Sequence, residues 1–132
     1  MSKARLVDWR AVTAAPVVLI SGAEDFFAAS SIREIREQLK RVDEALEIHE
    51  IEANEYASGQ LLNLTSPSLF AEPRLIIIRS VERCSDELIE DVISYLEEPT
   101  SDTCVVLRHN SSSVRGKKML DAIRLCEFAI EV

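Results

Sequence analysis

Three uninterrupted apolar runs constrain the fold more than any other feature of the chain. They lie at residues 16–21, 75–78 and 103–107, and each has the length of a β-strand. Their apolar residues are continuous instead of alternating with polar ones, which indicates burial on both faces, as in the middle of a parallel sheet.

The segments between these runs have the periodicity of helices or of half-buried strands. Residues 24–41 place Ala28, Ile32, Ile35 and Leu39 on one helical face. Ser85 is predicted to cap a second helix that ends before Pro99. Residues 56–64 and 114–125 predict two further helices, the last opened by Ser113, while residues 46–51 and 128–132 predict two more strands.

Strand and helix alternate through the chain, which predicts a three-layer α/β sandwich around a mostly parallel five-stranded sheet with right-handed crossovers. Residues 1–15 are interpreted as a lead-in segment and residues 16–132 as one α/β domain. With 132 residues, of which 47% are hydrophobic, the chain is long enough for a substantial core.

Composition excludes several classes of function. The net charge of −8 argues against direct electrostatic capture of DNA. Because no long apolar run or leader is found, we expect no membrane span and a cytoplasmic location. The three cysteines are expected to be buried free thiols. His49 is placed in a strand and His109 in a loop, without partners for a metal site.

The residues that would bind a nucleotide are missing. After the first strand the chain reads Gly22-Ala23-Glu24-Asp25, without the second glycine and the lysine of a phosphate loop. The third strand ends at Arg79, where a metal-binding aspartate would be needed. Gly116-Lys117-Lys118 lacks the upstream glycine and the following Ser or Thr. We therefore predict neither a cofactor nor enzymatic activity, and a degenerate nucleotide-binding domain remains an alternative.

A second alternative is a receiver-like signalling domain with Glu24 and Asp25 as its acidic magnesium site. Such a domain also needs an aspartate at the end of the third strand and a lysine after the fifth. Arg79 occupies the first of these positions, and no lysine follows the last strand in the sequence.

A short segment before the third strand carries an apolar pair, Leu69-Phe70. Pro67 and Pro73 bracket the pair and exclude a long helix or a central strand there. Leucine and phenylalanine are usually buried, so the pair can fill the core of its own domain. Alternatively, it can fill a groove in another protein.

Two stretches resemble a known family. The segment S-L-F-A-E-x-R-L-I-I-I-R, at residues 68–79, and the earlier G-A-E-D-F-F, at residues 22–27, are similar to the N-terminal domain of the delta subunit of bacterial DNA polymerase III. That resemblance implies an AAA+-type fold without a working nucleotide site, in a clamp-loader subunit that binds and helps to open the sliding clamp. It also implies a longer chain, with lid and collar regions beyond this first domain.

The resemblance assigns roles to individual residues. Leu69 and Phe70 would be the wedge that enters the peptide-binding groove of the clamp, and Ser66 and Ser68 would orient the turn. Thr65 stands where clamp-binding peptides often carry a glutamine. The implied partners are the sliding clamp (beta subunit) and the other clamp-loader subunits, with DNA contacted only through the assembled loader.

Overall fold

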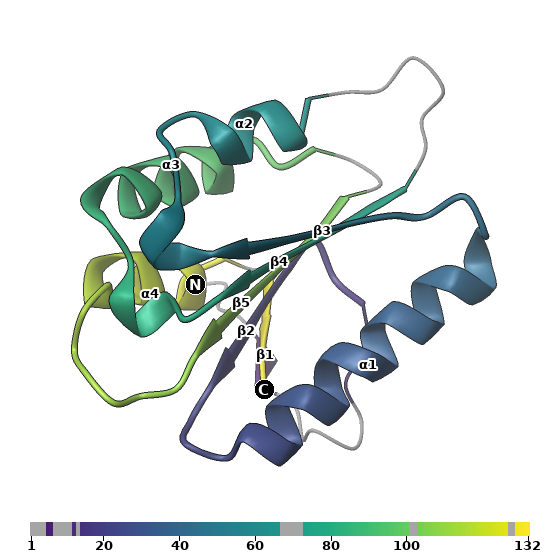
Figure 1. Cartoon of the computed structure of the whole chain (residues 1–132), viewed down its shortest axis with the longest axis horizontal. Helices are drawn as coiled ribbons and strands as arrows, with labels where there is room; N and C mark the ends of the chain where they lie inside the picture. The colour runs from purple at the N-terminus through teal and green to yellow at the C-terminus, as the bar shows by residue number, and fades with distance from the viewer. Residues whose placement is uncertain (1–4, 7–11, 13, 67–72, 101–102, 127–128) are drawn as a thin grey trace.

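The chain forms one six-stranded parallel sheet with helices on both faces (Figure 1). The computed structural model describes residues 5–6, 12, 14–66, 73–100, 103–126 and 129–132. Across the sheet the strand order is β1-β6-β2-β5-β4-β3. The predicted three-layer α/β sandwich is confirmed.

The three continuous apolar runs form the middle of this sheet. They are β2 (Val17–Ser21), β4 (Arg74–Arg79) and β5 (Thr103–His109), and β5 lies between the other two. Every residue of β5 is buried. The register pairs Val17 with Val105 and Ile76 with Val105, so branched side chains from three strands meet on the same face.

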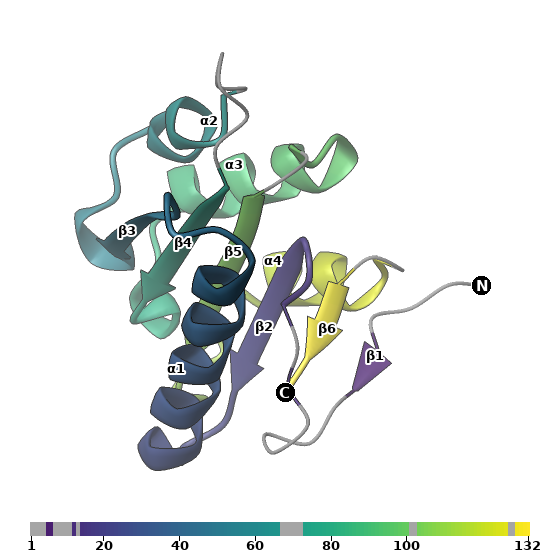
Figure 2. The same ribbon diagram turned by 90° about the vertical axis from the view of Figure 1, so that its right-hand side faces the viewer.

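The helices divide unequally between the two faces. Figures 1 and 2 show α1 (Asp25–Val42) alone on one face, while α2 (Gln60–Leu64), α3 (Asp86–Glu97) and α4 (Lys117–Arg124) cover the other. The core is split accordingly, because alternate residues of each strand point to opposite faces. Ile76 and Ile78 pack with α2, α3 and α4, whereas Leu75 and Ile77 pack with α1.

Capping residues and glycines set where the helices begin, and two helices begin later than the sequence predicts. The Ser85 hydroxyl accepts a hydrogen bond from Leu88 N at 3.3 Å, as predicted for the cap of α3. Helix α2 begins after Gly59, whose φ of 83° is left-handed, so residues 56–59 are not helical. Helix α4 begins after Gly116 in the same conformation, so Ser113 does not open it. Instead, the Ser113 hydroxyl donates to the backbone oxygen of Glu82 at 2.9 Å.

The two edges of the sheet are short or acidic strands. At one edge β1 (Arg5–Leu6) pairs with β6 (Ala129–Glu131). The five predicted strands are all present, and β1 adds a sixth within the segment interpreted as a lead-in. At the other edge β3 (Glu47–Glu52) pairs with β4 and is half buried, as its alternating pattern predicted.

The described cysteine and histidine side chains have structural surroundings. Cys84 and Cys104 are buried free thiols and Cys126 is a partly buried one. His109, predicted to lie in a loop, ends β5 and is buried. Its Nδ1 accepts from Ser111 N at 2.9 Å, so Nε2 carries the proton and donates to the Arg115 oxygen at 3.0 Å. Within the described residues, no group of His, Cys, Asp and Glu could hold a metal ion.

One further observation concerns membranes. Over the part of the chain that the structure describes, none of the helices combines the length and apolarity needed to cross a bilayer.

Candidate functional site

The predicted site residues, at positions 65, 66 and 68–70, belong to the connection between α2 and β4. Ser68, Leu69 and Phe70 fall outside the described residues. Thr65 caps the carboxyl end of α2 and Ser66 follows it, and the Ser66 oxygen accepts a hydrogen bond from Arg74, the first residue of β4. The structure therefore describes the residues on either side of the segment that contains the apolar pair.

The end of α2 is held by side chains from two other elements. Arg74, the first residue of β4, donates from Nη1 to the backbone oxygen of Leu64 at 2.7 Å and also to that of Ser66. Thr100, in the α3–β5 connection, donates its hydroxyl to the oxygen of Thr65 at 2.6 Å. These contacts, here named the carbonyl anchor, give three consecutive carbonyl groups partners that a helix end ordinarily lacks.

The Thr65 side chain belongs to this structural arrangement. Thr65 is buried, with 3% of its surface exposed, and its hydroxyl donates to the oxygen of Leu61 at 2.8 Å. The Thr65 hydroxyl is therefore engaged within the fold. Ser66, by contrast, is exposed and donates its hydroxyl to the oxygen of Leu62 at 3.0 Å.

The beginning of α2 is also fixed, through Tyr56 and Asp91. The Tyr56 hydroxyl donates to Asp91 Oδ2 at 2.5 Å and accepts from Leu61 N at 2.9 Å. Asp91, on α3, also accepts from Gly59 N at 2.8 Å. Burial, followed by the hydrogen bond to Asp91, raises the pKa of the Tyr56 hydroxyl. Helix α2 is thus attached to α3 at one end and to β4 at the other.

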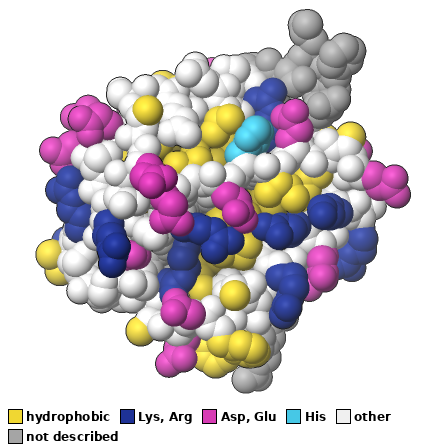
Figure 3. Space-filling view, viewed as in Figure 1, with side chains coloured by type: hydrophobic (Ala, Val, Ile, Leu, Met, Phe, Trp, Pro, Cys, Tyr) yellow, Lys and Arg dark blue, Asp and Glu magenta, His cyan; other side chains and the backbone are white. Residues whose placement is uncertain are grey.

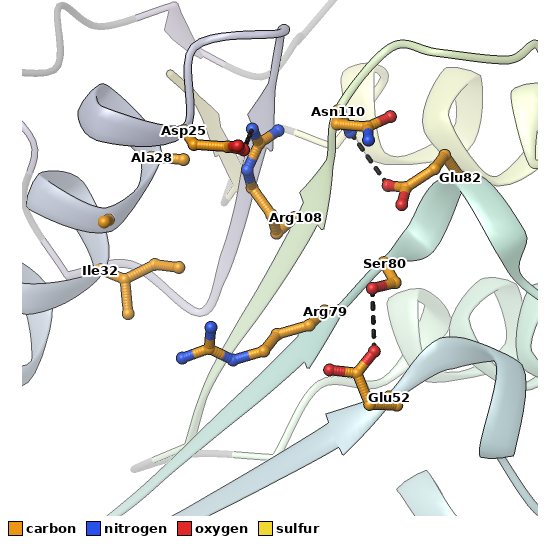
Figure 4. Close-up of a pocket in the computed structure, with 10 residues that line it drawn as sticks. Asp25, Ala28, Ile32, Glu52, Arg79, Ser80, Glu82, Arg108 and Asn110 are labelled. Carbon is orange, nitrogen blue, oxygen red and sulfur yellow. Dashed lines mark hydrogen bonds and ion pairs between the residues drawn. The ribbon is translucent and has the colours of Figure 1, made fainter.

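A second candidate region is a pocket of about 310 Å³ at the opposite, carboxyl end of the strands (Figure 4). It lies between the first turns of α1 and the ends of β3, β4 and β5. Its charged and amide-bearing lining residues come from all four of these elements and their loops: Asp25, Glu52, Arg79, Glu82, Arg108 and Asn110. This is the end of a parallel sheet at which open α/β folds bind ligands.

Internal contacts occupy the polar groups of this pocket. The buried Arg108 guanidinium donates to the oxygens of Gly22 and His109 at 2.8 and 2.6 Å, and its Nη2 lies 3.0 Å from Asp25 Oδ1. In Figure 4, Asp25 points directly at Arg108. The loop that would carry a phosphate site is thereby tied to β5 by a cation of the chain itself.

The remaining charges near the pocket are paired as well. Ser80 donates its hydroxyl to Glu52 Oε2 at 2.8 Å, and Asn110 N donates to Glu82 Oε1 at 3.1 Å. Arg79 lies 3.1 Å from Glu50 Oε1, which Arg36 of α1 also contacts at 3.0 Å. On the face drawn in Figure 3, basic and acidic side chains lie interspersed.

The family can be identified from the sequence that builds this geometry. The model of the family described as DNA polymerase III, delta subunit, matches residues 19–125, which include α2, the carbonyl anchor and the pocket. The chain belongs to this family.

Solved structures show how widely the delta-family fold is shared. Bacillus subtilis DNA clamp loader delta protein (YqeN) aligns with a TM-score of 0.69 and 18% identity, over 90% of this chain and 38% of that one. A mutant of Thermotoga maritima RuvB aligns with a TM-score of 0.54 and 13% identity, over 87% of this chain and 37% of that one. At these identities the likeness establishes an AAA+-type fold. No curated protein sequence matches the chain.

Sequence reasoning missed the residues that hold this delta-family site together. The sequence analysis gives Arg74 no role, because the groups that accept its hydrogen bonds are backbone oxygens, which have no sequence signature. Arg108 is easier to recognise from the sequence, because it directly follows the apolar run 103–107. If the buried strand includes Arg108, its charge needs a hydrogen-bonding or ionic partner.

Proposed function

We propose that this domain belongs to a clamp-loader delta subunit and binds the replicative sliding clamp. In this proposal Leu69 and Phe70 enter the peptide-binding groove of the clamp and help to open the ring. The observation that carries the proposal is membership of the delta family over residues 19–125, a range that includes the segment with the apolar pair. The chain spans 38% of the clamp loader delta protein that it resembles, so lid and collar regions are part of the proposal.

The energetics of a small apolar wedge suit such a role. Burying a leucine and a phenylalanine contributes about 1.5–3 kcal/mol each before the cost of association. Two such anchors can dominate a groove interface. Ser66 and Ser68 orient the turn in this proposal, while buried Thr65 acts within the fold and does not contact the clamp.

The domain acts without catalysis in this proposal. Support comes from the loop after β2, where Arg108 is bonded to Gly22 and Asp25 at the position of a phosphate site. The other loader subunits would supply ATP hydrolysis, and DNA would be contacted through the assembled loader. A role in replication implies a cytoplasmic location.

The test is calorimetric titration of the domain with the sliding clamp of the same organism, comparing the wild type with Leu69→Ala/Phe70→Ala. We expect the double variant to lose about 2 kcal/mol or more of binding free energy, on the scale of interface anchors. Val42→Ala/Leu125→Ala is the matched control, because both residues are apolar and exposed, at 84% and 59%. This control should bind like the wild type.

Circular dichroism and urea unfolding of each variant separate binding from folding. Absence of wild-type binding would refute the proposed function. Equal binding by a folded Leu69→Ala/Phe70→Ala variant would place the contact elsewhere, and unfolding of that variant would assign the pair to the core. Titration with ATP and magnesium, expected to release no heat, tests the alternative of a degenerate nucleotide-binding domain.

A further inference from the structure

We infer that Arg74 is a positioning residue for clamp binding. It acts through the carbonyl anchor, by fixing the end of α2 from which the segment with Leu69 and Phe70 departs. This inference rests on the proposed function and adds to it a residue outside the apolar pair, on the strand that follows.

Arg74 connects the two borders of the segment directly. It begins β4, so it follows the segment, while its recipients at Leu64 and Ser66 precede it. Pro73 is fixed in turn, because its oxygen accepts from Glu47 N of the neighbouring strand at 3.0 Å. One guanidinium group therefore joins the backbone before residues 67–72 to the strand that begins after them.

Helix α2 cannot supply this order by itself. It has five residues, far fewer than the 12–15 or so that an isolated helix needs to be even marginally stable in water. Its direction at the carboxyl end depends on the hydrogen bonds from Arg74 and Thr100. A segment whose ends are already fixed loses less conformational entropy when it binds, which strengthens binding without adding a contact.

The chemistry of the contact requires an arginine. Nη1 reaches two carbonyl oxygens while Nε lies 3.5 Å from Glu47 Oε2, an oxygen that His49 Nε2 also approaches at 3.8 Å. A guanidinium is planar and carries five donors in a fixed geometry, whereas a lysine ammonium is a compact point charge. Lysine would preserve the charge beside Glu47 without reproducing the set of hydrogen bonds.

The experiment compares Arg74→Gln with Arg79→Gln in the clamp titration. Arg79 is the matched control, because it lies at the other end of β4 and also pairs with a glutamate of β3. We expect Arg74→Gln to weaken clamp affinity roughly tenfold, as the loss of hydrogen bonds from a charged donor implies, with native circular dichroism. Arg79→Gln should leave affinity unchanged, and Arg74→Lys should stay as weak as Arg74→Gln.

A double-mutant cycle distinguishes positioning from direct contact. If Arg74 acts through the apolar pair, Arg74→Gln has little further effect in a Leu69→Ala background. An undiminished effect there would overturn the inference, as would wild-type affinity of Arg74→Gln or full recovery by Arg74→Lys. These outcomes leave the proposed function intact, whereas wild-type protein that fails to bind the clamp refutes the function itself.

Thr100→Val provides an independent variant should Arg74→Gln fail to fold. It removes the hydrogen bond to the oxygen of Thr65 and keeps a side chain of similar shape. We expect a two- to fivefold loss of affinity, roughly the effect of one neutral hydrogen bond. Unchanged affinity in a folded Thr100→Val variant would contradict the role assigned to the carbonyl anchor.

Discussion

Arg74 and Arg79 lie at opposite ends of β4, and their partners differ in kind. Arg74 is largely buried and bonds mainly to backbone oxygens of another element, whereas Arg79 is half exposed and pairs with the carboxylate of Glu50. The five-residue separation also places the two side chains on opposite faces of the sheet. At the amino end, side chains fix the backbone from which a segment departs. At the carboxyl end, charged side chains form ion pairs with one another around a pocket.

This difference suggests how the two ends of one α/β domain can diverge in function. The carboxyl end is where parallel sheets ordinarily bind ligands, yet here Arg108 bonds to Gly22 and Asp25 in the loop after β2. The amino end ordinarily serves stability, yet here it borders the segment proposed to bind the clamp. Substitutions at the carboxyl end should therefore affect folding without affecting clamp affinity.

The largest effect is expected for Arg108→Met. The change leaves the oxygen of Gly22 without its donor and removes one donor from that of His109, inside a mostly buried site. We expect the free energy of unfolding to fall by about 2 to 4 kcal/mol, measured by urea denaturation. Clamp affinity of the folded fraction should be unchanged, and a loss comparable with that of Arg74→Gln would break the distinction between the two ends.

Tyr56→Phe tests the amino end with a smaller change. It removes the hydroxyl that joins Asp91 to Leu61 N, and we expect a loss of about 1–2 kcal/mol in unfolding free energy. Clamp affinity should fall less than in Arg74→Gln, because the carbonyl anchor at the other end of α2 stays intact.

The same variant reveals a pH dependence. Because the folded-state pKa of Tyr56 is raised, the unfolded chain releases its tyrosine proton first, near pH 10. The contribution of Tyr56 to stability is therefore complete below that pH and is lost as the pH rises through the folded-state pKa. Urea unfolding from about pH 8 to 11 should show a steeper decline in the wild type than in Tyr56→Phe. If unfolding free energy fell equally with pH in the wild type and in Tyr56→Phe, the raised pKa of the Tyr56 hydroxyl would be contradicted.

The smallest effect is expected for Glu50→Gln. Glu50 is half exposed and joins Arg36 and Arg79 in a surface ion-pair network. Such pairs contribute little, so unfolding free energy should change by less than about 1 kcal/mol, and by less still in high salt. Clamp affinity should not change. A larger effect in either measurement would mean that the carboxyl end also supports the clamp-binding segment.

The sheet could be predicted from the sequence because its signal is continuous. Runs such as residues 16–21 and 103–107 are continuously apolar and lie in strands that are buried on both faces, which leaves little alternative to a central parallel strand. The cap at Ser85 was predictable for a similar reason, since the hydrogen bond is local and has a residue preference.

The helix starts and the role of Arg74 depend on tertiary contacts, which the sequence does not indicate. The sequence predicts that one helix begins at Tyr56 and that Ser113 opens another. In the structure each side chain bonds to a distant partner, and the helices start later, after Gly59 and Gly116. The Leu69-Phe70 pair is visible in the sequence as two apolar residues between Pro67 and Pro73, and only the family resemblance gives it a role. The role of Arg74 is not visible there, because a hydrogen bond from a side chain to a remote backbone oxygen leaves no periodicity or motif.

The acidic edge strand has a consequence for how the domain behaves in concentrated solution. An edge strand offers unpaired backbone groups to which a strand of another molecule can add. Along β3 the residues at positions 47, 50 and 52 are glutamates, in a chain whose net charge is −8. A second copy approaching this edge would bring carboxylates against carboxylates. Like charges opposite one another disfavour strand pairing, so this edge of the sheet is a poor surface for self-association.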